Sequence, residues 1–329
     1  MGFIIFLLIL LLLVALLFCA TVLYCFLRIF YSRDGFFSRK KADPYLPPGK
    51  VYLPHREKMK KWINAAQSIS HTNVEIKSRD GLTLRGNYYE YKPGAPIELM
   101  FHGYRGNAKR DLSAGVIRAF AIGHSVLIVD NRGCGQSDGH ISTFGVFESQ
   151  DCLDWIDYII DYIDFSAKII LTGISMGAST VLLAASNDSL PQNVIGVIAD
   201  CGYTSAEAII SRVISKLNLS PKLIMPFVKI GTKYLGKFDL SEASAIDAVE
   251  NCKVPVIFFH GDNDNFIPCE MSAENYEACG SEIKKLVIIE GAGHGLCYVI
   301  NPSKYIMEVK KFFESVAKDE DFDTESENS

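Results

Sequence analysis

Along the chain, short apolar or alternating apolar–polar runs, which predict strands, take turns with stretches of helical apolar spacing, which predict helices. Alternation at 73–77 and 82–91, joined by the turn Ser78–Gly81, predicts an antiparallel hairpin. After it, apolar runs predict strands at 97–101, 125–129, 168–171, 194–199, 254–259 and 285–289, and helical patterns lie at 107–123, 145–163, after Ser175 and at 302–317. This alternation predicts an α/β domain with a mostly parallel central sheet covered by helices on both faces.

The most apolar stretch lies near the N-terminus, where Phe3–Leu27 contains no charged residue. As a helix it would be about 37 Å long, enough to cross a hydrocarbon core of about 30 Å. A cleaved signal peptide is the alternative interpretation. The run is longer than a usual signal h-region, no basic residues precede it, and no A-x-A site follows. We therefore expect residues 1–30 to be a single-pass anchor in contact with membrane lipid.

The side of the membrane is indicated by the positive charges that follow this stretch, which are Arg28, Arg33, Arg39, Lys40 and Lys41. By the positive-inside rule they place the downstream domain in the cytoplasm. The nine cysteines agree with a reducing compartment, because they are odd in number and include no C-x-x-C.

Three further segments are predicted around the core of the chain. Residues 31–72 form a basic juxtamembrane linker with a short helix, which either rests on anionic head groups or presents a solvated face. Residues 73–317 form the α/β domain. Within it, 203–242 breaks the alternation and predicts a small helical cap over the site, the alternative being a surface excursion packed on the sheet edge. Residues 318–329 are acidic and polar, which predicts a disordered tail.

Composition narrows the classes of function. The 329 residues carry a formal net charge of −5, with no basic domain and no zinc-ligand spacing, so we expect neither a nucleic-acid partner nor a metal. No pattern indicates an oligomeric state. The scattered cysteines, Cys201 and Cys297 among them, are expected to be buried thiols.

The strongest chemical signal is G-x-S-x-G at Gly173–Gly177, which lies between a predicted strand and a predicted helix. The two glycines leave room for a sharp turn that holds Ser175 in a strained conformation with its hydroxyl exposed. In this context the motif predicts a nucleophile. A tight Gly-Ser turn without chemistry is the alternative.

Three other loops follow predicted strands, and the carboxyl ends of parallel strands share one edge of a sheet. In the first, after Phe101, we expect the Tyr104 N–H to form an oxyanion hole with the N–H of Met176, and His102 to be structural rather than a catalytic base. In the second, Asp264 is favoured to orient the base, ahead of Asp262 and then Asp200. The third presents His294 within Gly291–Gly295.

The order Ser175, Asp264, His294 is that of the α/β-hydrolase triad, and residues 73–317 resemble that superfamily, of the serine esterase, lipase and prolyl-oligopeptidase-like kind. Asp130–Ser137 also resembles the family's D-x-R-G-x-G-x-S loop. The similarity is greatest to bacterial membrane-anchored members. The resemblance implies hydrolysis through an acyl-enzyme, without a cofactor, and it does not fix the substrate.

We therefore expect a serine hydrolase that cleaves a small-molecule acyl ester. A thioesterase or a serine peptidase of the same fold is the main alternative, and a non-catalytic, membrane-tethered binding module is the alternative from another class. Arg105 and Arg132 could bind an anionic group of the substrate, although structural roles in their loops are favoured.

Overall fold

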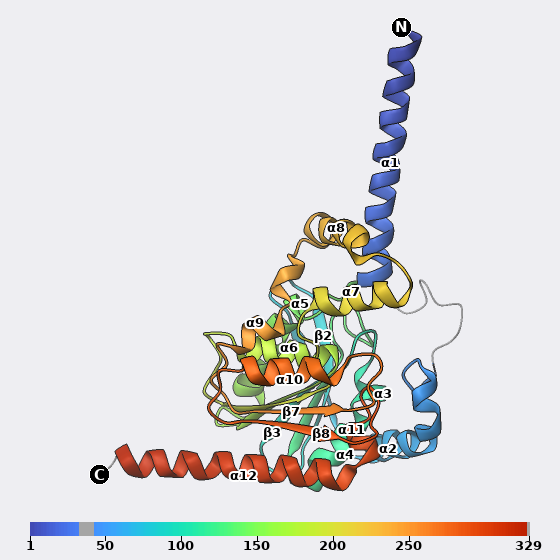
Figure 1. Ribbon diagram of the computed structural model, residues 1–329. Coiled ribbons are helices and arrows are strands. Elements are labelled where there is room, and N and C mark those ends of the chain that lie inside the picture. Colours follow the sequence, from blue (N-terminus) through green and yellow to red (C-terminus); the bar gives the residue numbers. More distant parts are fainter. Residues whose placement is uncertain (33–42, 328–329) are drawn as a thin grey trace.

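The computed structural model describes residues 1–32 and 43–327, with side chains as far as residue 317 (Figure 1). A central sheet lies between two layers of helices, and one long N-terminal helix projects away from this body. The mostly parallel α/β sheet predicted from the sequence is confirmed.

The sheet has eight strands in the order β1-β2-β4-β3-β5-β6-β7-β8. Strand β2 runs antiparallel to both β1 and β4, and the other neighbouring pairs are parallel. The strands are β1 Thr72–Lys77, β2 Thr83–Tyr89, β3 Ile97–Phe101, β4 Ser125–Val129, β5 Ile169–Ile174, β6 Val194–Asp200, β7 Val256–Gly261 and β8 Lys284–Ile289. The carboxyl ends of β3, β5, β6, β7 and β8 therefore meet at one edge.

Helices follow most of these strands. The α-helices are α1 Gly2–Phe30, α2 Arg56–Ser68, α3 Ala108–Asp111, α4 Ser113–Ala121, α5 Val146–Tyr158, α6 Met176–Ala185, α7 Ala206–Lys216, α8 Pro221–Gly231, α9 Ala245–Val249, α10 Cys269–Ala278, α11 Cys297–Ile300 and α12 Pro302–Glu327. Shorter helical turns are η1 Lys50–His55, η2 Ile159–Ile163, η3 Thr232–Gly236 and η4 Leu240–Glu242.

Hydrophobic cores form on both faces of the sheet because successive residues of a strand point to opposite faces. In β3, Leu99 and Phe101 pack with α5, α6 and α9, whereas Met100 packs with α4. Along β6 and β7, the face opposite α6 packs against Tyr305 and Phe312 of α12. Figure 1 shows these layers, with α6, α9 and α10 on one side of the sheet and α12 on the other. The strands are thus buried on both faces, as parallel sheets usually are.

A buried ion pair joins the sheet to α4. Glu98 of β3 is fully buried and accepts hydrogen bonds from Arg118 Nη1 at 2.9 Å and Thr172 Oγ1 at 3.0 Å. His124 Nδ1 lies 2.9 Å from the same carboxylate. Burial opposes ionisation of Glu98, but Arg118 and His124 outweigh it and lower its pKa from 4.5 to about 2.

Replacement of Glu98 by Gln is expected to lower the free energy of unfolding by about 3 kcal/mol, because Arg118 would remain buried without its counter-charge. The folded-state pKa of Glu98 lies below the unfolded value, so its stabilisation is full above pH 4.5 and is lost as the pH falls towards about 2. Thermal unfolding in detergent at neutral and acidic pH measures both effects. The control is E290Q at an exposed carboxylate, and equal melting temperatures for E98Q and E290Q would contradict the prediction.

The N-terminal helix α1 is packed against the α/β domain at one end, so it is not a flexible tether. Helix α1 is the one helix in the described part of the chain that is long and apolar enough to cross a membrane, a test that a signal sequence also passes. Its last turns are buried against the domain, through Val22, Phe26 and Phe30. The basic residues Arg33, Arg39, Lys40 and Lys41 lie outside the described residues.

The C-terminal segment also differs from its prediction. The sequence predicts disorder from Lys318, whereas α12 continues as a helix to Glu327. No glycine or proline interrupts this stretch, and its lysine and glutamate residues favour helix. Residues 328–329 of the predicted tail lie outside the described part of the chain.

Candidate active site

Ser175 lies at the turn between β5 and α6, where the chain reverses direction at the edge of the sheet. Its backbone has φ 58° and ψ −118°, a conformation that a residue with a Cβ rarely adopts. The turn is held by its neighbours: the Ser175 N–H donates to the Asp200 carbonyl at 2.8 Å. Strained backbone of this kind concentrates at functional sites.

The two glycines of the motif are required by close approach of the backbone. A Cβ on Gly173 would lie 2.1 Å from the carbonyl oxygen of Gly177. A Cβ on Gly177 would lie 2.2 Å from the carbonyl oxygen of Phe101, in the adjacent strand. Side chains at either position would therefore push the turn away from β3 and displace Ser175.

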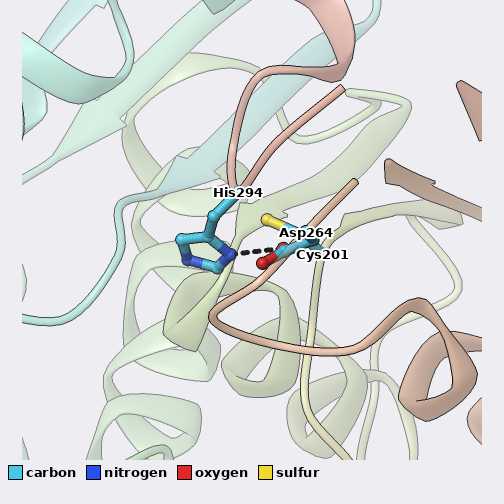
Figure 2. Close-up of side chains that lie close together, drawn as sticks. All are labelled: Cys201, Asp264 and His294. Carbon is cyan, nitrogen blue, oxygen red and sulfur yellow. Dashed lines mark hydrogen bonds and ion pairs between the residues drawn. The ribbon is translucent and has the colours of Figure 1, made fainter. Parts of the chain in front are cut away.

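The structure brings together three side chains that are far apart in the sequence. His294 Nε2 lies 2.9 Å from Ser175 Oγ, and His294 Nδ1 lies 2.7 Å from Asp264 Oδ2. Figure 2 shows the imidazole directed at the carboxylate. Asp264 comes from the loop after β7 and His294 from the loop after β8, so the sheet topology itself produces the convergence.

The environment of Asp264 keeps it ionised. Its Oδ1 accepts the N–H groups of Phe266 at 2.8 Å and Ile267 at 2.9 Å. Burial opposes the charge, but hydrogen bonds from His260 and His294 outweigh it and hold the pKa of Asp264 well below its usual range. A carboxylate in this position fixes the orientation of the imidazole that it faces.

His260 is a second partner of Asp264 that sequence reasoning missed. It is fully buried at the end of β7, with Nε2 3.0 Å from the Ile267 carbonyl and 3.3 Å from Asp264 Oδ2. Ser272 Oγ lies 2.7 Å from its Nδ1. The signal in the sequence was the position of this histidine four residues before Asp264, where it can support the same carboxylate.

The other two acids considered for this role face elsewhere. Asp262 Oδ1 accepts the N–H of Gly291 at 2.7 Å, and the residue is exposed. Asp200 is buried beneath the turn, and burial raises the pKa of its carboxyl group. Of the three candidates, Asp264 is the one whose carboxylate is hydrogen-bonded to His294 in the described structure.

The loop after β3 runs beside the nucleophile. A Cβ on Gly103 would lie 3.4 Å from Ser175 Cβ, which places the following N–H of Tyr104 close to the serine. Met176 begins α6, so its N–H belongs to the unpaired first turn of that helix. Within the described residues, neither N–H donates to a protein acceptor. Both amides are therefore free to bind a negative oxygen.

Three charged or titratable side chains named from the sequence have structural partners. His102 is buried, accepts the Asn131 N–H at Nε2 and donates from Nδ1 to the Gly103 carbonyl at 2.7 Å. Arg132 forms ion pairs with Asp151 and Asp80, at 2.6 and 2.8 Å. Arg105 donates to carbonyls at the end of α1.

Cys201 adds a thiol to the site. Its Sγ and the ligand atoms of Asp264 and His294 all lie within 4.8 Å of one another, a set of residue types that could hold a metal ion (Figure 2). Metal binding requires a thiolate, and burial raises the pKa of Cys201 well above its ordinary value. His294 is also already paired with Asp264. The arrangement therefore fits a neutral buried thiol better than a metal ligand.

A cavity of about 530 Å³ opens at Ser175 and His294. One wall comes from the segment that follows α1: Pro47, Pro48, Val51 and Tyr52 line it, and Tyr52 is buried there. Val51 lies so close to the His294 loop that a Cβ on Gly293 would be 2.9 Å from its Cγ2. We call residues 47–59 the N-terminal strap.

This wall corrects the prediction that the cap covers the site. Residues 203–242 do form helices α7 and α8, but in the described structure none of them lines this cavity. Their apolar faces instead pack with Phe30, Phe144 and Met176. The cap fills the space beside the nucleophile, and the strap, predicted as a juxtamembrane linker, covers the cavity.

Comparison with known proteins agrees with this architecture. A family model described as the alpha/beta hydrolase fold matches residues 99–219. The chain is 24% identical to the uncharacterized protein YqkD of Bacillus subtilis over 290 residues, which are 88% of this chain and 92% of that protein. It is 26% identical to protein bem46 of Schizosaccharomyces pombe over 225 residues, 66% of this chain and 69% of that protein.

Among solved structures, esterase Pf2001 of Pyrococcus furiosus superposes with a TM-score of 0.61 at 21% identity, over 84% of this chain and 99% of that chain. At this identity the likeness shows the fold alone. Since the sequence relatives come from a bacterium and a yeast, the bacterial, membrane-anchored part of the resemblance stays a prediction.

Proposed function

Since the chain has the alpha/beta hydrolase fold, we propose that it is a serine hydrolase that cleaves carboxylic esters through an acyl-enzyme. The observation that carries the proposal is the continuous pair of hydrogen bonds from Ser175 Oγ through His294 to Asp264, of 2.9 and 2.7 Å. A serine hydroxyl becomes an effective nucleophile when an oriented base can take its proton. The esterase name of Pf2001 points to the same reaction class.

In the acylation step, Ser175 Oγ attacks the acyl carbon while its proton passes to His294 Nε2. The negative oxygen of the tetrahedral intermediate accepts hydrogen bonds from the N–H groups of Tyr104 and Met176. Asp264 stabilises the imidazolium through its hydrogen bond with Nδ1. His294 then gives the proton to the departing alkoxide, which leaves as an alcohol.

In the deacylation step, a water takes the place of the alcohol, and His294 accepts its proton as it attacks the acyl carbon. The intermediate collapses, the carboxylic acid leaves, and Ser175 Oγ recovers its proton from His294. The strap supplies apolar surface beside the nucleophile, through Val51 and Tyr52. Such a wall favours an acyl substrate with an apolar part.

We also propose that α1 is retained as an anchor in the membrane, with the domain on the cytoplasmic side. The support is that Cys25, Phe26 and Phe30, at the C-terminal end of α1 (its lower end in Figure 1), are buried in the α/β domain. Arg28 lies in the last turn of the helix, on the side that the positive-inside rule assigns to the cytoplasm.

Labelling with a fluorophosphonate probe tests the proposal directly. Full-length protein in detergent is expected to form one covalent adduct, which peptide mass spectrometry locates at Ser175. A panel of acyl esters, acyl thioesters and aminoacyl amides then measures which bond is cleaved fastest, and esters are expected to lead. Faster thioester or amide cleavage would change the substrate class. A folded protein that is not labelled and turns over no member of the panel would favour a binding module.

A further inference from the structure

The lower end of α1 is part of the domain rather than a free stalk. Residues 1–20 are exposed, and burial begins at Val22. Arg105 Nη2 donates to the carbonyl of Tyr31 at 2.7 Å, and the Tyr104 hydroxyl donates to that of Ile29, so the end of the helix is fixed to the loop beside Ser175. The part of α1 that precedes Val22, residues 2–21, is about 30 Å long, which equals the thickness of a hydrocarbon core.

Helix α8 lies beside α1 at the level where residues 2–21 end and burial in the domain begins (Figure 1). The rings of Phe227 and Phe18 are 5.4 Å apart, and Phe18 belongs to the exposed part of α1. A Cβ on Gly231 would lie 3.0 Å from Phe26 Cβ, so the two helices are in close contact. If 2–21 crosses the bilayer, Phe227 is at the depth of its cytoplasmic boundary.

The faces of α8 and the turn η3 that continues it have different chemistry. Leu223, Phe227 and Tyr234 follow helical spacing. Phe227 contacts Phe18, and Leu223 and Tyr234 are each 70% exposed. The turn before α8 adds exposed leucines. Exposed lysines lie along one side of this apolar face. We call this set the cap surface; its apolar members are Leu217, Leu219, Leu223, Tyr234 and Leu235, and its exposed lysines are Lys222, Lys229 and Lys233.

We infer that the cap surface docks on the anionic leaflet in which α1 is embedded, with the apolar side chains at the level of the acyl chains and the lysines at the head groups. An exposed apolar face flanked by lysines is the pattern of a helix that lies in the membrane interface. Because α8 contacts α1, the cap surface meets the same bilayer that α1 crosses. The inference rests on the proposed anchoring by α1 and is independent of the proposed chemistry.

Quenching by brominated lipid tests the inference in full-length protein reconstituted in nanodiscs. The discs contain phosphatidylglycerol and a phosphatidylcholine brominated near the carbonyl end of one acyl chain. Three single variants each add one tryptophan, and the emission of the parent protein, which has two, is subtracted. F6W reports on α1, L223W on the cap surface, and F165W on an 82% exposed position before β5, at the opposite edge of the sheet.

L223W is expected to lose a fraction of its emission comparable to that of F6W and to shift to shorter wavelength, whereas F165W is unaffected. If the emission of F6W is quenched but L223W stays as bright as F165W, the docking is overturned and the anchor stays in place. Unquenched F6W would overturn the anchor and the docking together. L223W combined with K222E and K233E is expected to be quenched less, because the lysines hold the surface at anionic head groups.

Discussion

Replacement of Ser175 by alanine is expected to lower kcat for an activated ester by roughly 10⁶-fold, the loss found when the triad nucleophile of a serine protease is removed. The remaining rate would come from the oxyanion donors and from substrate binding. Alanine keeps the Cβ, so the strained backbone at φ 58° is not relieved and the fold is expected to persist. Burst kinetics with a chromogenic ester measure both the acylation step and the turnover.

Two matched variants separate loss of chemistry from loss of structure. S186A removes a hydroxyl at the other end of α6, where Ser186 Oγ donates to the Leu182 carbonyl, and it is expected to retain full activity. S175G is also expected to be inactive, but to melt at a higher temperature than the unmodified protein, because glycine adopts a positive φ without strain. Substantial turnover by S175A would refute the assignment of the nucleophile.

Replacement of Asp264 by asparagine is expected to lower kcat by about 10⁴-fold, because it selects the wrong tautomer of the base. The Phe266 and Ile267 N–H groups donate to Oδ1, so the amide oxygen of asparagine would take that position. Its NH₂ group would then face His294 Nδ1, which would have to accept. His294 Nε2 would carry the proton and could not receive one from Ser175.

The two rival acids supply the controls for this experiment. D262N and D200N are expected to keep activity within a few-fold of the unmodified protein, since neither carboxylate has a hydrogen bond to His294 in the described structure. Initial rates with one activated ester, measured across the pH range, rank the three variants. A larger loss in D262N or D200N than in D264N would assign the acid to another loop.

The parts of the site that the sequence predicted are those with a local cause. Gly173 and Gly177 are needed because a Cβ at either position would lie 2.1 or 2.2 Å from a backbone oxygen of the same turn or of the neighbouring strand. A strand-turn-helix context makes this requirement recognisable in one stretch of sequence. Asp264 and His294 were predicted from their places after strands, because parallel strands bring their carboxyl ends to one edge.

The parts that it did not predict depend on packing between distant segments. The strap begins with Pro47 and Pro48, and nothing in these prolines indicates that Val51 and Tyr52 will cover the cavity. His260 lies in an apolar strand, and its place four residues before Asp264 does not by itself distinguish a supporting histidine from an ordinary buried one. Residues 203–242 were correctly expected to be helical, but their partner is the lower end of α1, a contact that periodicity cannot assign.

The burial of the lower end of α1 has a consequence for engineering the protein. The ring of Phe30 packs between those of Phe144 and Phe238, with centroid distances of 5.6 and 5.5 Å. A chimaera that replaces the whole helix with a foreign one would therefore leave a cavity between these two aromatic rings. The boundary for a graft lies at Val22, within one unbroken helix. A water-soluble version is better sought by substituting charged side chains for apolar ones on the outward face of residues 2–21 than by deleting the helix.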